Sequence, residues 1–216
     1  MDGFRAAAPL RSLEGYYMQR VMVFIDFENF NIALINYYFN ALKKATPRLD
    51  YRKMPHELIK KLPVAGYVVK TIVCAPKPDE FLMGIDSKKN TYNWINGLKN
   101  MDYFSVIEGE HVARPVAGFT KDTMKPDNPA SYYVVEKGTD INMATEIVSK
   151  AYLNAYDTAV IISGDSDYIP VLKILSTIGK SSVMVGIKGQ NLSRVKQHVD
   201  QIIILDEDFF GSCLRS

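Results

Sequence analysis

The segment 157–186 combines features that few folds accommodate. An apolar run at 159–162 ends in a Ser-Gly pair, two carboxylates follow at Asp165 and Asp167, and an amphipathic stretch leads to a second apolar run at 182–185. This order predicts a strand, an acidic turn, a helix and another strand. Ligands of open parallel sheets bind beyond the carboxyl ends of the strands, so the two Asp residues are expected where chemistry takes place.

Two further Asp residues occupy similar places, one at the end of an apolar run and one at the start of a helical stretch. The continuous apolar run 21–25 is typical of a strand buried on both faces, and it ends at Asp26. Asp140 opens a helical stretch at 141–155. If these strands are neighbours in one sheet, folding gathers acids that lie far apart in the sequence.

The rest of the chain predicts an α/β fold with a mainly parallel central sheet flanked by helices, because strand and helix patterns alternate. Strands are expected at 21–26, 67–75, 103–108, 159–162, 182–185 and 202–205, and helices at 29–44, 91–99, 141–155, 168–178 and, as a short one, near 192–198. Residues 111–135 hold three prolines and predict an irregular, hairpin-like insertion with strands near 111–114 and 132–135. In the helix 141–155, the apolar stripe is expected to comprise Ile141, Ala144, Val148, Ala151, Tyr152 and Ala155, with Glu146 nearly opposite.

Length and composition favour one domain, expected at 20–207, with a loosely ordered leader at 1–19 and a tail at 208–216. The net charge of +2 neither favours nor excludes nucleic acid. Cys74 and Cys213 are the only cysteines and have no metal-type spacing, which indicates a reducing, cytoplasmic setting. No stretch reaches the roughly 20 apolar residues of a membrane helix, and the N-terminus lacks a signal-peptide core. The sequence leaves a homo-oligomer open.

Gathering Asp26, Asp140, Asp165 and Asp167 requires charge compensation. Two like charges about 4 Å apart repel by roughly 4 kcal/mol at an effective dielectric of 20. Protons or a divalent cation must offset this, and an all-oxygen ligand set favours Mg²⁺ or Mn²⁺. Such a cation assists in-line attack on a phosphodiester. The competing interpretation is structural, because Asp140 and Asp167 are suited to cap helices.

Three other side chains are candidate substrate-binding groups. Lys137 lies three residues before Asp140, and Arg194 belongs to a basic, Gly-containing segment at 188–196, so both are candidates for contact with phosphate groups. The Ser163 hydroxyl is placed to bond a ligating carboxylate. A solvated role suits Lys137 equally well, a solvated loop is the commoner outcome for the segment of Arg194, and Ser163 is also suited to tighten the turn. Glu28 is expected to be solvated, and His111 has no identifiable partner.

Three motifs in chain order resemble those of the NYN domain, in the LabA-like branch of the PIN-like ribonuclease fold. They are VFIDFENFN at 23–31, KGTDINMATEIVSKA at 137–151 and AVIISGDSDYIPVLKILSTIGKSSVMVG at 159–186. The resemblance implies divalent-metal-dependent cleavage of RNA, single-stranded because a flexible backbone can enter a carboxylate-lined groove. It implies that Asp26, Asn29, Asp140, Asp165 and Asp167 occupy the metal-site positions. Glu146 departs from the pattern, because many relatives have Asp there.

Two other functions remain open. A non-catalytic RNA-binding or scaffolding protein would keep the fold without turnover. A haloacid-dehalogenase-type phosphohydrolase also uses an Asp after its first strand, but Glu28 stands where that signature requires a second Asp. Asn29 has a structural alternative as well, as a cap of the helix that it begins.

Overall fold

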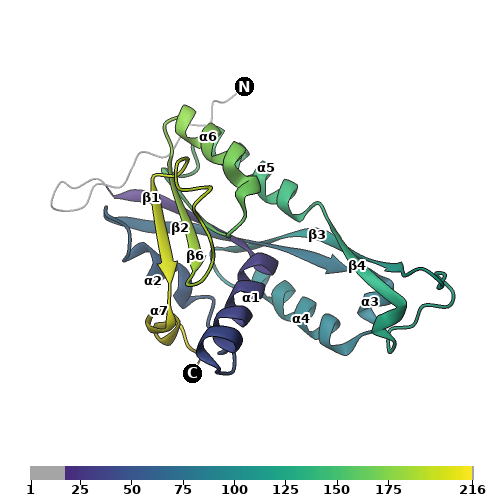
Figure 1. Cartoon of the computed structure of the whole chain (residues 1–216). Coiled ribbons are helices and arrows are strands. Elements are labelled where there is room, and N and C mark those ends of the chain that lie inside the picture. The colour runs from purple at the N-terminus through teal and green to yellow at the C-terminus, as the bar shows by residue number, and fades with distance from the viewer. Residues whose placement is uncertain (1–17, 216) are drawn as a thin grey trace.

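A computed structural model of the chain describes residues 18–215, and these form an α/β fold around one seven-stranded sheet (Figure 1). The strand order is β4-β3-β2-β1-β5-β6-β7, and every neighbouring pair is parallel except β3 and β4. The strands are β1 Gln19–Asp26, β2 Gly66–Pro78, β3 Phe104–Pro115, β4 Tyr132–Lys137, β5 Thr158–Ile162, β6 Ser181–Ile187 and β7 Gln201–Leu205. The predicted mainly parallel α/β architecture is therefore confirmed. Of the expected leader, residues 1–17 lie outside the described range.

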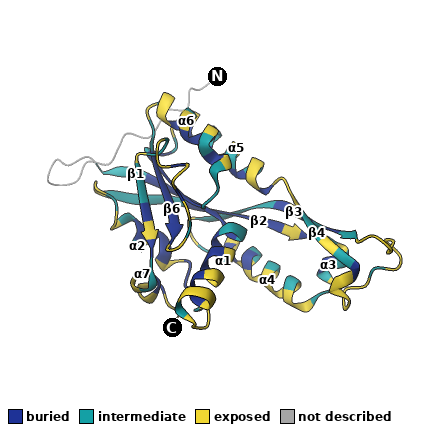
Figure 2. Cartoon of the chain, viewed as in Figure 1, coloured by how far each residue is buried: buried dark blue, intermediate teal, exposed yellow. Residues whose placement is uncertain are grey.

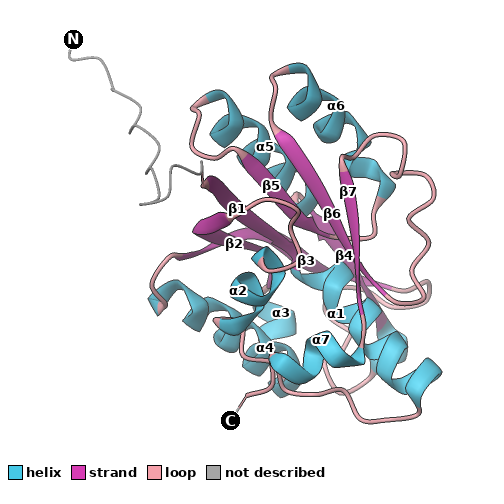
Figure 3. Ribbon diagram, turned by 90° about the vertical axis from the view of Figure 1, so that its left-hand side faces the viewer, coloured by secondary structure: helices cyan, strands magenta, loops and turns pink. Residues whose placement is uncertain are grey.

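Helices cover both faces of the sheet (Figure 3). They are α1 Phe27–Asn36, which continues as the π-helical η1 Tyr37–Leu42, α2 Lys53–Ile59, α3 Glu80–Met83, α4 Asp86–Gly97, α5 Thr139–Tyr152, α6 Ile169–Thr177 and α7 Glu207–Ser212. Short 3₁₀ turns are η2 Leu98–Asn100, η3 Pro129–Ser131 and η4 Ser166–Tyr168. Within residues 18–215, no helix is both long and apolar enough to cross a membrane.

Strand β1 is the centre of two hydrophobic cores. Val23 and Ile25 join the core that α1, α2 and α7 cover, whereas Met22 and Phe24 join the core under α5 and α6. This alternation follows from the two-residue period of a strand. Figure 2 shows the central strands as the most buried part of the chain. A strand buried on both faces holds its carboxyl end, and Asp26, in a fixed position.

The expected insertion at 111–135 is more regular than the sequence indicated. Strand β3 continues to Pro115, and β4 pairs with it antiparallel, so the two extend the sheet as a hairpin, with α3 beside it (Figure 1, right). Only residues 116–128 form an irregular loop. The prediction of a short helix near 192–198 is wrong, because turns occupy 193–198. There the Asn191 side chain accepts a hydrogen bond from the Ser193 amide at 3.0 Å, a local bond that competes with a helix.

Helix α5 is rotated relative to the predicted stripe. The buried residues are Thr139, Met143, Ile147 and Ala151, whereas Ile141 and Tyr152 are 71% and 68% exposed. The stripe begins at Thr139 because this residue packs against Gly109 of β3. Glu146 consequently flanks the buried stripe, and the expectation that it lies opposite is wrong. In the expected tail, α7 packs on the core through Phe209 and Phe210.

Candidate functional site

Asp26 and the turn after β5 meet at the carboxyl edge of the sheet. Strands β1 and β5 are parallel neighbours with Ile25 opposite Ile162, so their ends lie side by side. The Ser163 Oγ donates a hydrogen bond to Asp26 Oδ2 at 3.0 Å and accepts one from the Asp165 amide at 3.1 Å. The Asp167 amide in turn donates to Asp165 Oδ1 at 2.9 Å. One hydrogen-bonded chain thus joins three of the predicted acids.

Two of these acids also cap the start of a helix. Asp26 is the N-cap of α1 and accepts a hydrogen bond from the Asn29 amide, and Asp165 is the N-cap of η4. Capping by Asp140 and Asp167, the structural alternative, is wrong, because both lie inside the first turns of their helices. Capping fixes the side chain of Asp26, at the end of β1, and that of Asp165, after β5. Both carboxylates are thereby preorganised for a ligand.

Asp140 faces the same edge from α5. Its Oδ1 accepts a hydrogen bond from the Tyr168 hydroxyl at 3.3 Å. Burial raises the pKa of Asp140, and the negative charges of Asp165 and Asp167 add to the rise, against the opposing effect of Tyr168. The acids therefore repel one another, although they come from separate motifs.

The environment of Asp26 disfavours a negative charge. Asp26 is 4% exposed, and burial raises its pKa to about 6. Hydrogen bonds from the Asn29 amide and the Ser163 hydroxyl oppose this rise, whereas the charges of Asp140 and Asp165 reinforce it. Its ionised form is therefore less favourable than that of an exposed Asp, and a bound cation would stabilise it.

The Asn29 side chain connects three segments. Its Oδ1 accepts hydrogen bonds from the Gly164 amide at 2.8 Å and from Gln190 Nε2 at 3.2 Å. Gln190 Oε1 accepts from the Ile187 amide at 2.8 Å at the end of β6. A Cβ on Gly164 would lie 2.4 Å from Gln190 Nε2, so glycine allows this close approach. The side chain of Asn29 does not cap α1, since Asp26 does.

The three expected substrate-binding residues differ in position. Ser163 is 2% exposed and bonds Asp26 and the Asp165 amide, so it supports a carboxylate rather than facing solvent. Arg194 is exposed, and its Nη1 lies 3.5 Å from Ser166 Oγ, beside the acidic turn. Lys137 is exposed at the end of β4, and within residues 18–215 its side chain makes no hydrogen bond or ion pair.

The donor set of this edge suits a hard divalent cation. Asp26, Asp140, Asp165 and Asp167 offer oxygen atoms only, and in residues 18–215 none of them forms a salt bridge with Lys, Arg or His. Asp140 and Asp167 line an open cavity of about 420 Å³. Oxygen ligands, uncompensated charge and solvent access fit Mg²⁺ or Mn²⁺.

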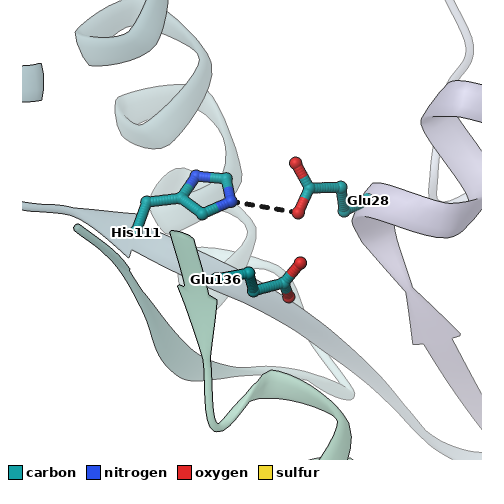
Figure 4. Close-up of side chains that lie close together, drawn as sticks. All are labelled: Glu28, His111 and Glu136. Atoms are coloured by element: carbon teal, nitrogen blue, oxygen red, sulfur yellow. Dashed lines mark hydrogen bonds and ion pairs between the residues drawn. The ribbon is translucent and has the colours of Figure 1, made fainter. Parts of the chain in front are cut away.

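A tighter group lies beside this edge, and sequence reasoning missed it (Figure 4). Glu28, His111 and Glu136 each offer a ligand atom, and these atoms lie within 4.8 Å of one another. In the described part of the chain, no three of the four predicted acids approach each other so closely. The expectation that Glu28 is solvated is wrong, because His111 Nε2 lies 3.0 Å from its Oε2.

The two glutamates of this group have opposite pKa shifts. Burial disfavours the Glu28 carboxylate, but the contacts with His111 and Glu136 outweigh it and lower the pKa to about 2. Burial and the adjacent Glu28 raise the pKa of Glu136 to about 8, against the effect of the Thr139 hydroxyl. A proton shared by the pair is therefore favoured on Glu136 over Glu28.

Comparison with known proteins agrees with the motifs. The family model described as NYN domain matches residues 20–206. No curated protein matches the sequence significantly. Among solved structures, a protein of unknown function from Vibrio parahaemolyticus is similar, with a TM-score of 0.54 and 13% identity, over 92% of this chain and 97% of that one. At this identity the likeness shows the fold alone.

Proposed function

Because the chain belongs to the NYN domain family, a family of PIN-like nucleases, we propose that it is a divalent-metal-dependent ribonuclease acting on single-stranded RNA. The observation that supports this most is the chain of hydrogen bonds from Asp26 through Ser163 to Asp165. It aligns carboxylates at the carboxyl edge of a parallel sheet without a compensating basic residue. The assignment to the LabA-like branch remains a prediction.

In this proposal, Asp26, Asp140, Asp165 and Asp167 would hold Mg²⁺ or Mn²⁺. The bound cation supplies Lewis-acid stabilisation of the charge that develops on a phosphodiester. Ser163 and Tyr168 orient the carboxylates that they contact, and Asn29 holds the acidic turn against α1. Arg194, exposed beside that turn, is placed to contact an RNA phosphate. The exposed Lys137 is a second candidate for this contact.

The decisive experiment compares cleavage of labelled single-stranded RNA with Mg²⁺, with Mn²⁺ and with chelator. Asp26→Asn and Asp165→Asn should each lower the rate far more than tenfold, since tenfold is only about 1.4 kcal/mol of barrier. The matched control is Asp102→Asn, an exposed residue in the loop before β3, at the opposite edge of the sheet. Full activity in Asp26→Asn, or cleavage that a chelator does not affect, would refute the mechanism.

Glu146→Gln tests the departure from the family pattern. The Glu146 carboxylate is 26% exposed, pairs with Lys150 at 3.2 Å, and acts electrostatically on Cys74, the neighbour of Asp26 across β1 and β2. We expect a smaller loss than in either Asp variant, because Lys150 already neutralises this charge. A loss as large as in Asp165→Asn would place Glu146 among the ligands.

The alternatives predict other results in the same assay. Tight RNA binding without turnover would support a non-catalytic RNA-binding or scaffolding protein. Hydrolysis of a small phosphomonoester, with RNA left intact, would support a phosphohydrolase. We place the protein in a reducing compartment such as the cytoplasm, in agreement with its two buried free cysteines.

A further inference from the structure

The group formed by Glu28, His111 and Glu136 comes from three separate elements. Glu28 lies in the first turn of α1, and His111 and Glu136 face each other across the antiparallel pair β3 and β4 (Figure 4). Directly opposed residues in such a pair project to the same face of the sheet, with their Cβ atoms about 5 Å apart. The hairpin register and the start of α1 therefore create the group together.

Its geometry resembles that of an open metal site. The three ligand atoms lie within 4.8 Å of one another, and His111 Nε2 is 3.0 Å from Glu28 Oε2. Tetrahedral ligands at about 2.1 Å from one ion are about 3.4 Å apart, so the widest pair in the group would close by about 1.4 Å at most when an ion binds. His111 is 7% exposed, which fixes its ring, whereas Glu136 is exposed and leaves a path for an ion.

A buried hydroxyl adjoins the group. Thr139 is 1% exposed, and its Oγ1, which acts on the adjacent Glu136 carboxylate, makes no hydrogen bond of good geometry within residues 18–215. This hydroxyl would lie only 2.1 Å from a Cβ on Gly109, and alternation along β3 places Gly109 on the same face as His111. A buried hydroxyl so poorly satisfied gains from a better partner, and a water bound to an ion in this group would provide one.

We propose that Glu28, His111 and Glu136 form a second cation site, which takes a first-row divalent transition-metal ion such as Zn²⁺ or Mn²⁺. One imidazole nitrogen and two carboxylates are a mixed donor set that selects against Mg²⁺, which prefers oxygen ligands and retains its waters. Three protein ligands leave coordination positions for water. This site is distinct from the carboxylates around Asp26, and it does not depend on RNA cleavage.

The test is a titration of the metal-free protein with Zn²⁺ alone, followed by the ring resonances of histidine in NMR spectra and by calorimetry. The chain has three histidines, so assignment through His111→Gln is direct. We expect Zn²⁺ to shift the His111 ring, Mg²⁺ to leave it unchanged, and Glu136→Gln to weaken Zn²⁺ binding at least tenfold. Glu136 is exposed, so this isosteric variant should fold even if His111→Gln does not.

Two control variants distinguish the outcomes. His56→Gln, in an exposed position on α2, should bind Zn²⁺ as the parent does. Asp165→Asn should retain the shift at His111 even if it abolishes cleavage of RNA, which separates this inference from the proposed function. A His111 ring that does not respond to Zn²⁺ would mean that the group is a proton-sharing triad. Loss of the response in Asp165→Asn would assign the ion to the other carboxylates. Either result would overturn the proposal.

Discussion

The Ser163 hydroxyl donates a hydrogen bond to Asp26 Oδ2 over 3.0 Å, and it joins side chains that are 137 positions apart in the sequence. Both residues are buried, so neither partner can replace the bond with bulk water. The contact therefore determines both the position of the Asp26 carboxylate and how readily it loses its proton.

Ser163→Ala should destabilise the protein by about 1–3 kcal/mol, because the buried Asp26 oxygen loses its donor. The same change should raise the pKa of Asp26 further, since the lost bond favours the ionised form. Urea unfolding at several pH values measures both effects. Ser193→Ala, in an exposed turn, is the control and should change stability little. Equal stability of the two variants would contradict the role assigned to Ser163.

Asp26→Asn should stabilise the metal-free protein at neutral pH. Burial raises the folded-state pKa from 3.8 to about 6, so the unfolded chain releases its proton first as the pH rises. The free energy of unfolding should therefore fall between about pH 4 and 6 in the parent, by up to about 3 kcal/mol at about 1.4 kcal/mol per pKa unit. This decrease should be absent in Asp26→Asn. Thermal unfolding in chelator across this range measures it, and a variant less stable than the parent at neutral pH would disprove the burial effect.

Gly109→Ala should destabilise the fold by about 3 kcal/mol, as overpacking does in a tightly packed core. A Cβ there would lie 2.6 Å from the Thr139 amide nitrogen and 2.8 Å from the Lys137 carbonyl oxygen. Both are backbone atoms, so adding Thr139→Ala should not restore stability. Gly97→Ala is the matched control, because a Cβ at Gly97 meets nothing within 4 Å. It should be neutral or stabilise the protein slightly.

Asn29→Ala should cost about 2 kcal/mol, because the Gly164 amide and the Gln190 side chain lose their common acceptor. The acidic turn would then be less firmly held, so cleavage of RNA should fall by more than the stability change explains. Asn40→Ala removes only an exposed contact with Asn36 and serves as the control. The prediction fails if the two variants are equally stable.

The sequence predicts the edge of the sheet better than the hairpin. Asp26 and Asp165 are predictable from the sequence. Each follows a continuous apolar run, which is the pattern of a strand buried on both faces. The pairing of His111 with Glu136 depends on the register across the loop 116–128, which no local pattern specifies. The buried face of α5 is ambiguous from the sequence, because the nearby apolar residues Ile141, Met143 and Ala144 lie on different faces of the helix. Contact of Thr139 with Gly109, a tertiary effect, decides between them.

The bonds that Asn29 makes have a consequence for a chain during synthesis. The two donors to its side chain, the Gly164 amide and Gln190 Nε2, lie 135 and 161 positions later in the sequence. A growing polypeptide that has not yet reached residue 190 lacks one of the anchors of the acidic turn. A chain truncated before residue 190 should therefore hold the acidic turn less firmly, and under the proposed function it would reach full activity only once nearly the entire chain has been made.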